Sequence, residues 1–192
     1  MVGLVQKLLL DLVEEVGGPG TAADVKRRAG VPFDRVFHMQ EVYDDAEFQR
    51  LFAAACEVLN LTQEQAEKVY ADYFLRDGLK RWPTWFEMSS NARQFLERQP
   101  AIHNNFATGV QDPTAREAII DKFRLEKLDA ELIMHYRSPN HLCGLYMALA
   151  RWIIEHYGDR ATVRESACVS NGDAECQIHI HWEPGAKQDR RS

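Results

Sequence analysis

Seven histidines and four cysteines are the side chains of this sequence best suited to bind a metal. His103 is the strongest candidate, because Phe95, Leu96 and Phe106 lie near its face of a predicted helix at three- and four-residue spacing. Histidine is the commonest metal ligand, so an imidazole aimed at an apolar core could hold a buried metal group. The periodicity is equally compatible with a buried histidine that only forms hydrogen bonds, and both readings stay open at this point.

The C-terminal hairpin carries a second group of metal-binding side chains. Cys168 and Cys176 lie eight residues apart on two predicted strands, and His179 and His181 follow. Cysteine and histidine in this number could form a tetrahedral zinc site. Side chains alternate along a strand, however, so the two histidines share a face that Cys176 does not, and four ligands need a bulge to converge. Zinc and a pair of free thiols both remain open.

Composition excludes several classes of protein. The net charge is −6 without a basic cluster, which argues against nucleic acid as a partner. The apolar N-terminal stretch is interrupted by Lys7, Asp11 and Glu14, so we expect neither a membrane span nor a signal peptide, and we expect a cytoplasmic protein with reduced thiols. Cys56 and Cys143 are interpreted as core residues. No phosphate loop, nucleophile elbow or HExxH pair is present, so we expect no enzyme.

Hydrophobic periodicity predicts a chain that is helical first and mixed afterwards. The helices are expected at 4–16, from Thr21, at 46–59, at 63–77 and at about 89–110. The second part is expected to contain strands at 116–126 and 129–137, a helix at 140–157, and a hairpin of strands at 161–169 and 174–182 joined at Asn171-Gly172.

The predicted fold class is therefore α+β, with a helical N-terminal lobe and a β-β-α-β-β module. We expect one domain over 1–183, divided into lobes at 1–112 and 113–183. A flexible tail is expected over 184–192.

Four segments, in register over nearly the whole chain, resemble the H-NOX (haem-nitric oxide/oxygen-binding) family, in particular its bacterial stand-alone members. The opening Met1-Val2-Gly3-Leu4-Val5-Gln6-Lys7 resembles M-x-G-L-V-N-K, and Val42-Tyr43-Asp44-Asp45 resembles Y-x-D-x-x. The segment from Phe95 to His103 resembles F-L-x-N-L-D-x-[LV]-H, and the segment from Tyr136 to Asn140 falls where the family has Y-x-S-x-R.

The resemblance implies a haem b site between the two lobes, with His103 as the axial ligand to iron. It assigns the haem propionates to Tyr136, Ser138 and Asn140. Asn140 replaces the family's arginine, so the propionates lose a charged, bidentate partner. The proximal pocket would be lined by Phe95, Leu96, Phe106 and Pro113.

The distal side of the haem decides which gas binds. The resemblance places Val5, Phe74 and Leu145 there, although ordinary core packing explains the same residues. Bound O₂ needs a hydrogen-bond donor that nitric oxide does not need, so this apolar set predicts NO and CO binding with little or no O₂ binding. Tyr146 lies one position away, and a shift of register would reverse this prediction.

The resemblance implies a sensor in which NO weakens the bond between iron and His103 and shifts the helices. No output domain is seen in the sequence, so we expect the signal to reach a separate protein such as a histidine kinase or a cyclic-di-GMP enzyme. Two alternatives remain. One is a haem-free module that senses redox state through Cys168 and Cys176, with or without zinc. The other is a sensor of another hydrophobic small molecule.

Overall fold

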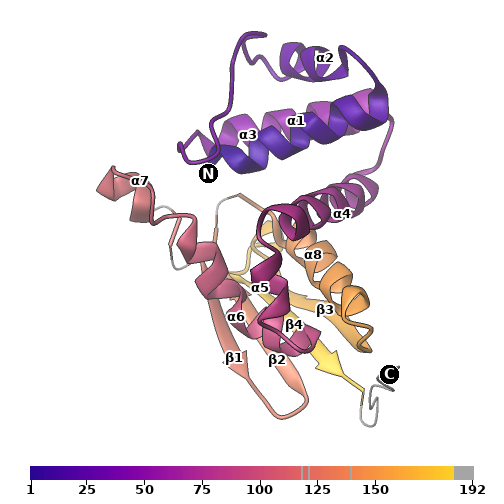
Figure 1. The fold of residues 1–192 in the computed structure, drawn as a ribbon, viewed down its shortest axis with the longest axis vertical. Coiled ribbons are helices and arrows are strands. Elements are labelled where there is room, and N and C mark those ends of the chain that lie inside the picture. The colour runs from indigo at the N-terminus through magenta and orange to yellow at the C-terminus, as the bar shows by residue number, and fades with distance from the viewer. Residues whose placement is uncertain (118, 121, 139, 184–192) are drawn as a thin grey trace. The chain divides into compact units, whose positions relative to one another are not determined.

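The computed structural model describes residues 1–117, 119–120, 122–138 and 140–183 (Figure 1). Two compact units make up the chain. Unit 1 contains residues 1–74 and 104–120, and unit 2 contains residues 75–103 and the chain from 121 onward. Helices α4 and α6 each run from one unit into the other, so neither unit is a continuous stretch of sequence.

Unit 1 is helical, and local sequence signals define its helices. Thr62 and Gln65 form a reciprocal capping box, with N–H···O distances of 2.9 and 3.2 Å, and Asp44 caps the next helix upstream by accepting from the Ala46 N–H at 3.1 Å. The helices are α1 (Gly3–Gly17), α2 (Thr21–Arg28), α3 (Asp45–Leu59), the first part of α4 (Gln63–Arg81) and α7 (Pro113–Glu117).

The core of unit 1 forms where α1, α2 and α3 pack on one another. Leu4, Leu8 and Phe48 are almost completely buried, and so is Tyr70 of α4. Gly3 is required at the start of α1, because a Cβ atom there would lie 2.3 Å from the His38 carbonyl oxygen. Burial of large apolar side chains therefore stabilises this unit.

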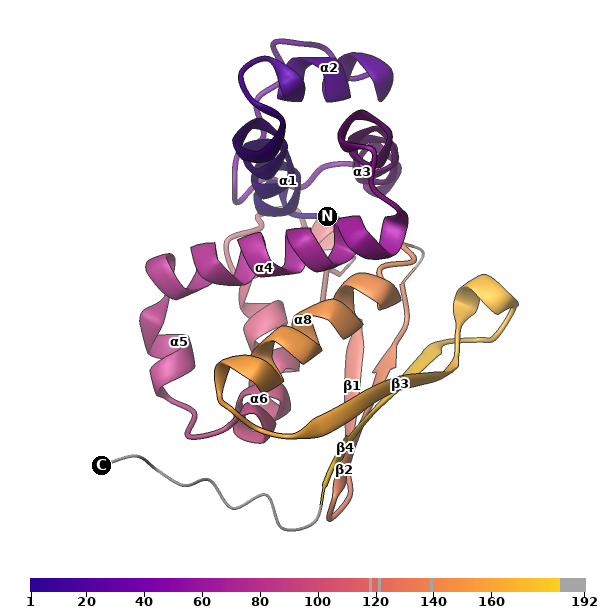
Figure 2. The ribbon, with the colours of Figure 1, turned by 90° about the vertical axis from the view of Figure 1, so that its right-hand side faces the viewer.

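Unit 2 is built on an antiparallel sheet with strand order β1-β2-β4-β3. Helix α8 (Cys143–His156) packs on β3 and β4, and Figure 2 shows it lying across the sheet. Inward positions such as Leu132, Met134, Ile178 and Ile180 are fully buried. The strands are β1 (Phe123–Lys127), β2 (Glu131–Tyr136), β3 (Ala161–Ala167) and β4 (Cys176–Trp182).

The remaining helices of unit 2 are the end of α4, α5 (Pro83–Glu87) and α6 (Ala92–Asn105) up to His103. Asp159, which follows α8, caps α6 by accepting from the Ala92 N–H at 2.7 Å. Phe95 of α6 stacks on Phe86 of α5 at 4.9 Å between ring centroids. These contacts hold α6, which carries His103, within unit 2.

The predicted α+β class and the β-β-α-β-β order are confirmed. The strand predicted over 116–126 is wrong in its first half. Asp112 accepts from the Ala115 N–H at 2.7 Å, and the chain forms helix α7 before β1 begins at Phe123. Helix α5 was not predicted. No helix among the described residues is both long enough and apolar enough to cross a membrane. The tail predicted over 184–192 lies outside the described residues.

Candidate functional site

His103, the predicted axial ligand, lies in the last turn of α6 and is half-buried. Its ring meets the ring of Phe123 on β1 edge-on, with 4.9 Å between the centroids. Phe123 also stacks on Tyr136 of β2 at 4.9 Å and contacts Tyr146 of α8 at 5.4 Å. His103, Phe123, Tyr136 and Tyr146 therefore form one group, the aromatic cluster, drawn from four elements of unit 2.

The three residues predicted to bind the propionates lie together at the end of β2. Tyr136, Ser138 and Asn140 are all buried, and the Ser138 hydroxyl accepts a hydrogen bond from the Asn140 N–H at 3.2 Å. Burial raises the pKa of Tyr136 to about 12, although hydrogen bonds from Ser138 and the Leu142 backbone oppose the shift. The tyrosine therefore stays protonated and can donate a hydrogen bond at neutral pH.

Two buried polar atoms near this group have no hydrogen-bond partner within the described part of the chain. One is the side-chain oxygen of Asn140, and the other is the hydroxyl of Tyr146. Burial also raises the pKa of Tyr146, so its hydroxyl keeps its proton. Unpaired buried polar groups are costly, and a bound group that engages them would remove that cost.

The other residues predicted for a haem pocket are divided between the two units. Leu145 and Leu96 are buried in unit 2, and Phe95 packs against Phe86 and Tyr157 rather than against the aromatic cluster. In unit 1, the Tyr70 hydroxyl donates to the Val5 carbonyl at 2.6 Å. The Tyr70 ring meets the Phe74 ring edge-on, with 6.0 Å between the centroids. Phe106 is half-buried in unit 1, and Pro113 is exposed as the first residue of α7.

A second cluster lies where the start of α8 meets β3, β4 and the turn between them. Its members are Cys143, Glu165, Cys168 and Cys176, and we call it the thiol cluster. One donor atom from each residue lies within 4.8 Å of the others. The Sγ atom of Cys168 is 3.6 Å from that of Cys143 and 3.8 Å from that of Cys176. The three cysteines are buried, and burial raises the pKa of the Cys143 and Cys176 thiols.

A shift of register between Glu165 and Ala167 allows this convergence. The bulge that the ligand set requires is therefore on β3. Glu165 precedes it and lies on the inward face, paired with Ile178, and the shift after Glu165 turns Cys168 to the same side as Cys176. The Oε1 atom of Glu165 is buried without a hydrogen-bond partner among the residues that the structure describes.

The structure does not bring His179 and His181 to the thiols. His179 lies on the opposite face of β4, where its ring nitrogens contact Glu131 at 2.9 Å and Ser166 at 2.8 Å. His181 is exposed on that same face. The structure thus brings together three cysteines and one glutamate rather than the predicted two cysteines and two histidines, and Cys143, interpreted from the sequence as a core residue, lies among them.

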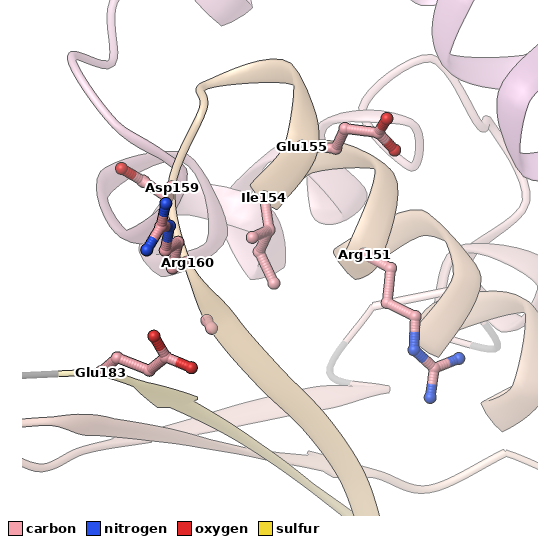
Figure 3. A pocket seen from close by; sticks show the side chains of 7 residues that line it. Arg151, Ile154, Glu155, Asp159, Arg160 and Glu183 are labelled. Carbon is pink, nitrogen blue, oxygen red and sulfur yellow. The ribbon is translucent and has the colours of Figure 1, made fainter. Parts of the chain in front are cut away.

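A surface pocket lies at the other end of α8 and has a volume of about 330 Å³ (Figure 3). Arg151, Glu155, Asp159, Arg160 and Glu183 line it together with two apolar residues. Its lining includes no residue of either cluster, and its charges are mixed in sign.

Sequence reasoning missed Phe123 and Glu165 and undervalued Tyr146 and Cys143. Phe123 begins a short strand and has no motif of its own. Glu165 stands three residues before Cys168, a spacing that would have suggested a ligand pair once the bulge was known. Cys143 is separated from the other thiols by more than twenty residues of sequence.

Comparison with known proteins identifies the family. A family model described as Haem-NO-binding matches residues 2–165. The soluble guanylate cyclase gcy-37 of Caenorhabditis elegans is 28% identical over 105 residues, which are 54% of this chain and only 15% of the cyclase. This chain thus matches a small part of that relative's length.

Solved H-NOX structures share the fold at low sequence identity. The unliganded Fe(II) H-NOX protein of K. algicida has a TM-score of 0.80 at 18% identity and covers 98% of this chain and 100% of its own. An oxygen-binding H-NOX domain, solved as its oxygen complex, has a TM-score of 0.74 at 15% identity and covers both chains completely. The S. oneidensis H-NOX protein in its Fe(II)NO state has a TM-score of 0.71 at 16% identity, covering 95% and 99%.

The family model extends over most of the 192 residues, and the shared fold includes both the helices and the four-stranded sheet. The chain therefore belongs to the haem-NO-binding, or H-NOX, family of haem-based gas-sensor domains.

Proposed function

We propose that this H-NOX domain is a nitric oxide sensor that binds haem b through His103. The observation that carries the proposal is that His103 and Tyr136, far apart in sequence, contact the same Phe123 ring. The predicted axial ligand and the first predicted propionate ligand are thereby placed beside one aromatic wall. A porphyrin needs an imidazole, an apolar wall and polar donors within reach of each other.

The residues of unit 2 fit a haem group, although weakly on the propionate side. Tyr136, Ser138 and the Asn140 amide nitrogen can donate hydrogen bonds to carboxylates, whereas the unpaired side-chain oxygen of Asn140 can only accept one. None of these three carries a charge, so each bond is weaker than one from arginine. We expect haem to bind, with faster loss than in relatives that have the arginine.

Haem iron supplies the position at which a diatomic gas binds. The chain's own contribution is to hold the iron through His103, to orient the group through Tyr136, Ser138 and Asn140, and to exclude water with apolar side chains. A gas that alters the bond to His103 would change the contacts of α6, and such differential contacts shift a conformational equilibrium.

Nitric oxide is favoured over O₂ by the residues proposed for the distal side. Val5, Phe74 and Leu145 offer no side-chain donor, and the proton of the neighbouring Tyr70 hydroxyl is engaged by the Val5 carbonyl. Tyr146 follows Leu145, and its hydroxyl has no hydrogen-bond partner among the described residues. We place Tyr146 outside the gas-binding side and expect no stable O₂ complex.

The output is proposed to reach a separate effector, such as a histidine kinase or a cyclic-di-GMP enzyme. H-NOX domains are sensor domains without catalysis of their own, and the matched relative gcy-37 is by name a guanylate cyclase. Only the sensing part of that cyclase is aligned with this chain.

The visible spectrum of the purified protein tests haem binding. We expect a Soret band that the His103→Ala variant loses, whereas the matched control His38→Ala, at an exposed histidine, keeps it. A band of full intensity in both variants would rule out His103 as the ligand.

Exposure of the reduced protein to air tests the choice of gas. We expect oxidation without a stable oxygen complex, and formation of a nitrosyl complex when NO is added. A stable oxygen spectrum that disappears in Tyr146→Phe would instead make Tyr146 the donor and overturn the NO assignment.

The thiol cluster supports a second function, the binding of a zinc ion. Tetrahedral zinc lies about 2.3 Å from each sulfur, which places two such sulfurs about 3.8 Å apart. The separations of 3.6 and 3.8 Å match that spacing, and the unpaired Glu165 oxygen supplies a fourth ligand atom. A haem-free protein could sense redox state here, because oxidised thiols do not bind zinc.

Zinc content measured by mass spectrometry tests this second function. We expect about one zinc ion per chain after purification with zinc, and loss of the ion in Cys168→Ser. His181→Ala and Cys56→Ser are the matched controls, because neither residue belongs to the cluster. If the His181 variant also lost zinc, our ligand set would be wrong.

A further inference from the structure

The chain between β2 and α8, of which the structure describes residues 137–138 and 140–142, lies between the two clusters in sequence. Tyr136 precedes this connection and Cys143 follows it, while Ser138 and Asn140 lie within it. Cys143, a residue of the thiol cluster, therefore follows the residues proposed to bind the propionates.

Three contacts link this connection and its two flanking residues to the β3–β4 turn and the start of β4. At its first end, Tyr136 pairs directly with Cys176 in the sheet register. At its other end, the Cys143 Sγ atom lies 3.6 Å from that of Cys168. Between them, the His141 Nδ1 atom lies 3.1 Å from the Ser170 hydroxyl.

His141 has a left-handed backbone, with φ of 52°, which costs energy for a residue with a side chain. Such a conformation persists only when its surroundings hold it. The contact with Ser170 constrains the backbone at His141, and the contact of Cys143 with Cys168 constrains the chain that follows. The shape of the connection thus depends on the turn that carries the thiols.

Two hydrogen bonds hold the turn itself, and each involves a cysteine of the thiol cluster. The Cys168 N–H donates to the Asp173 carboxylate at 2.8 Å, and the Val169 N–H donates to the Cys176 Sγ atom at 3.4 Å. Without an ion, Cys143 reaches the turn only through weak thiol contacts. Four metal–ligand bonds would fix α8, β3 and β4 to one another at this point.

We propose that the metal state of the thiol cluster controls how tightly the domain holds haem. With zinc bound, the connection keeps the arrangement in which Tyr136, Ser138 and Asn140 meet the propionates. Without zinc, the connection becomes mobile and haem is lost faster. This proposal rests on the proposed haem and zinc sites and adds a coupling between them.

The coupling should be strong in this chain because the propionate donors are neutral. Weak bonds contribute to affinity only when the groups are ordered beforehand, since ordering them on binding costs entropy. Coupling between two sites is reciprocal, so haem must raise zinc affinity by the same factor by which zinc raises haem affinity.

The test uses the haem-loaded protein and measures transfer of haem to an excess of apomyoglobin. We expect removal of zinc with a chelator to speed haem loss by about tenfold, within the usual range of coupled sites, and added zinc to restore the slow rate. Zinc affinity, measured with and without haem, should change by the same factor as haem affinity measured with and without zinc.

The Ser170→Ala variant separates coupling from simple unfolding, because Ser170 is neither a zinc nor a haem ligand. We expect it to keep one zinc ion and its Soret band but to lose haem about threefold faster with zinc present, the effect of one hydrogen bond. In haem-free protein, zinc should slow hydrogen exchange of the amides at 137–138 and 140–143.

Equal rates of haem loss with and without zinc, in a protein that binds both, would overturn the coupling and leave both sites intact. A protein with a Soret band but no zinc would overturn it as well. A protein without a Soret band would instead overturn the proposed haem function.

Discussion

The two clusters of unit 2 differ in how much of a binding site the chain supplies locally. The thiol cluster brings four ligand atoms within 4.8 Å, a complete set for a small ion. The aromatic cluster and the adjoining Ser138 and Asn140 bring one imidazole, an aromatic wall and neutral donors, and the Asn140 oxygen and the Tyr146 hydroxyl have no partner among the described residues. A few residues of one unit can bind a small ion. A large planar group needs contacts from many elements, so the loss of any one of several contacts can lower its affinity.

The largest expected effect is that of zinc on stability. An ion that binds only the folded state at a thousand times its dissociation constant adds about 4 kcal/mol. For a chain of this size, that free energy corresponds to a rise in melting temperature of about 10 °C. Calorimetry before and after chelation measures the change.

The Cys56→Ser variant is the matched control, because Cys56 is half-buried in α3, outside the cluster. It should show the same change on chelation as the unmodified chain. If melting is unaffected by chelation in both proteins, the thiol cluster is an ordinary group of buried thiols.

The next effect is a gain in haem retention at Asn140, beside the aromatic cluster. Asn140→Arg should slow haem loss by about tenfold, because a charged, bidentate donor adds about 1.4 kcal/mol over a neutral one. The same variant should destabilise the haem-free protein, since Asn140 is buried and an arginine there would be an unpaired buried charge.

Haem transfer and urea unfolding measure these two opposite changes. Asn140→Gln is the control, because it lengthens the side chain without adding charge. If both variants lost haem at the unmodified rate, the side chain at this position would not touch the propionates.

The elements around these clusters were largely predictable, since helical periodicity and the Asn171-Gly172 turn are local signals. The outward side of β4 was also predictable, because alternation places His179 away from Cys176. Local signals of this kind can be interpreted without knowledge of the tertiary structure.

The composition of each cluster was less predictable, because it depends on contacts between distant elements. Phe123 joins His103 to Tyr136 only because β1 pairs with β2 and α6 ends beside it. Cys168 faces the other thiols only because β3 shifts register after Glu165. Neither the pairing partner of a strand nor a bulge has a reliable sequence signal.

A smaller effect is expected at Tyr146, whose buried hydroxyl has no partner among the described residues. Tyr146→Phe keeps the ring contact with Phe123 and removes the unpaired group, so the haem-free protein should gain up to about 1 kcal/mol of stability. Urea unfolding measures the change. A loss of similar size would show that the hydroxyl binds a partner, such as an ordered water, inside the aromatic cluster.

The smallest effect concerns pH and the turn that carries the thiols. Glu175 precedes Cys176, and its pKa is lowered chiefly by the hydrogen bond with His135, with a 2.7 Å separation between Glu175 Oε1 and His135 Nδ1. A lowered carboxyl pKa stabilises the fold above the ordinary value of about 4.3, and that contribution disappears as pH falls through the lowered value.

Glu175→Gln should therefore cost less than about 1 kcal/mol at neutral pH, as for other partly exposed pairs, and nothing in strong acid. Urea unfolding at a series of pH values measures the difference between the two proteins. If the variant also lowered zinc affinity, the contact with His135 would help to position Cys176, and the thiol cluster would depend on the outer face of the sheet. An unchanged zinc affinity would show that residues on the inner face alone position the four ligands. The thiol cluster would then be specified locally, unlike the aromatic cluster.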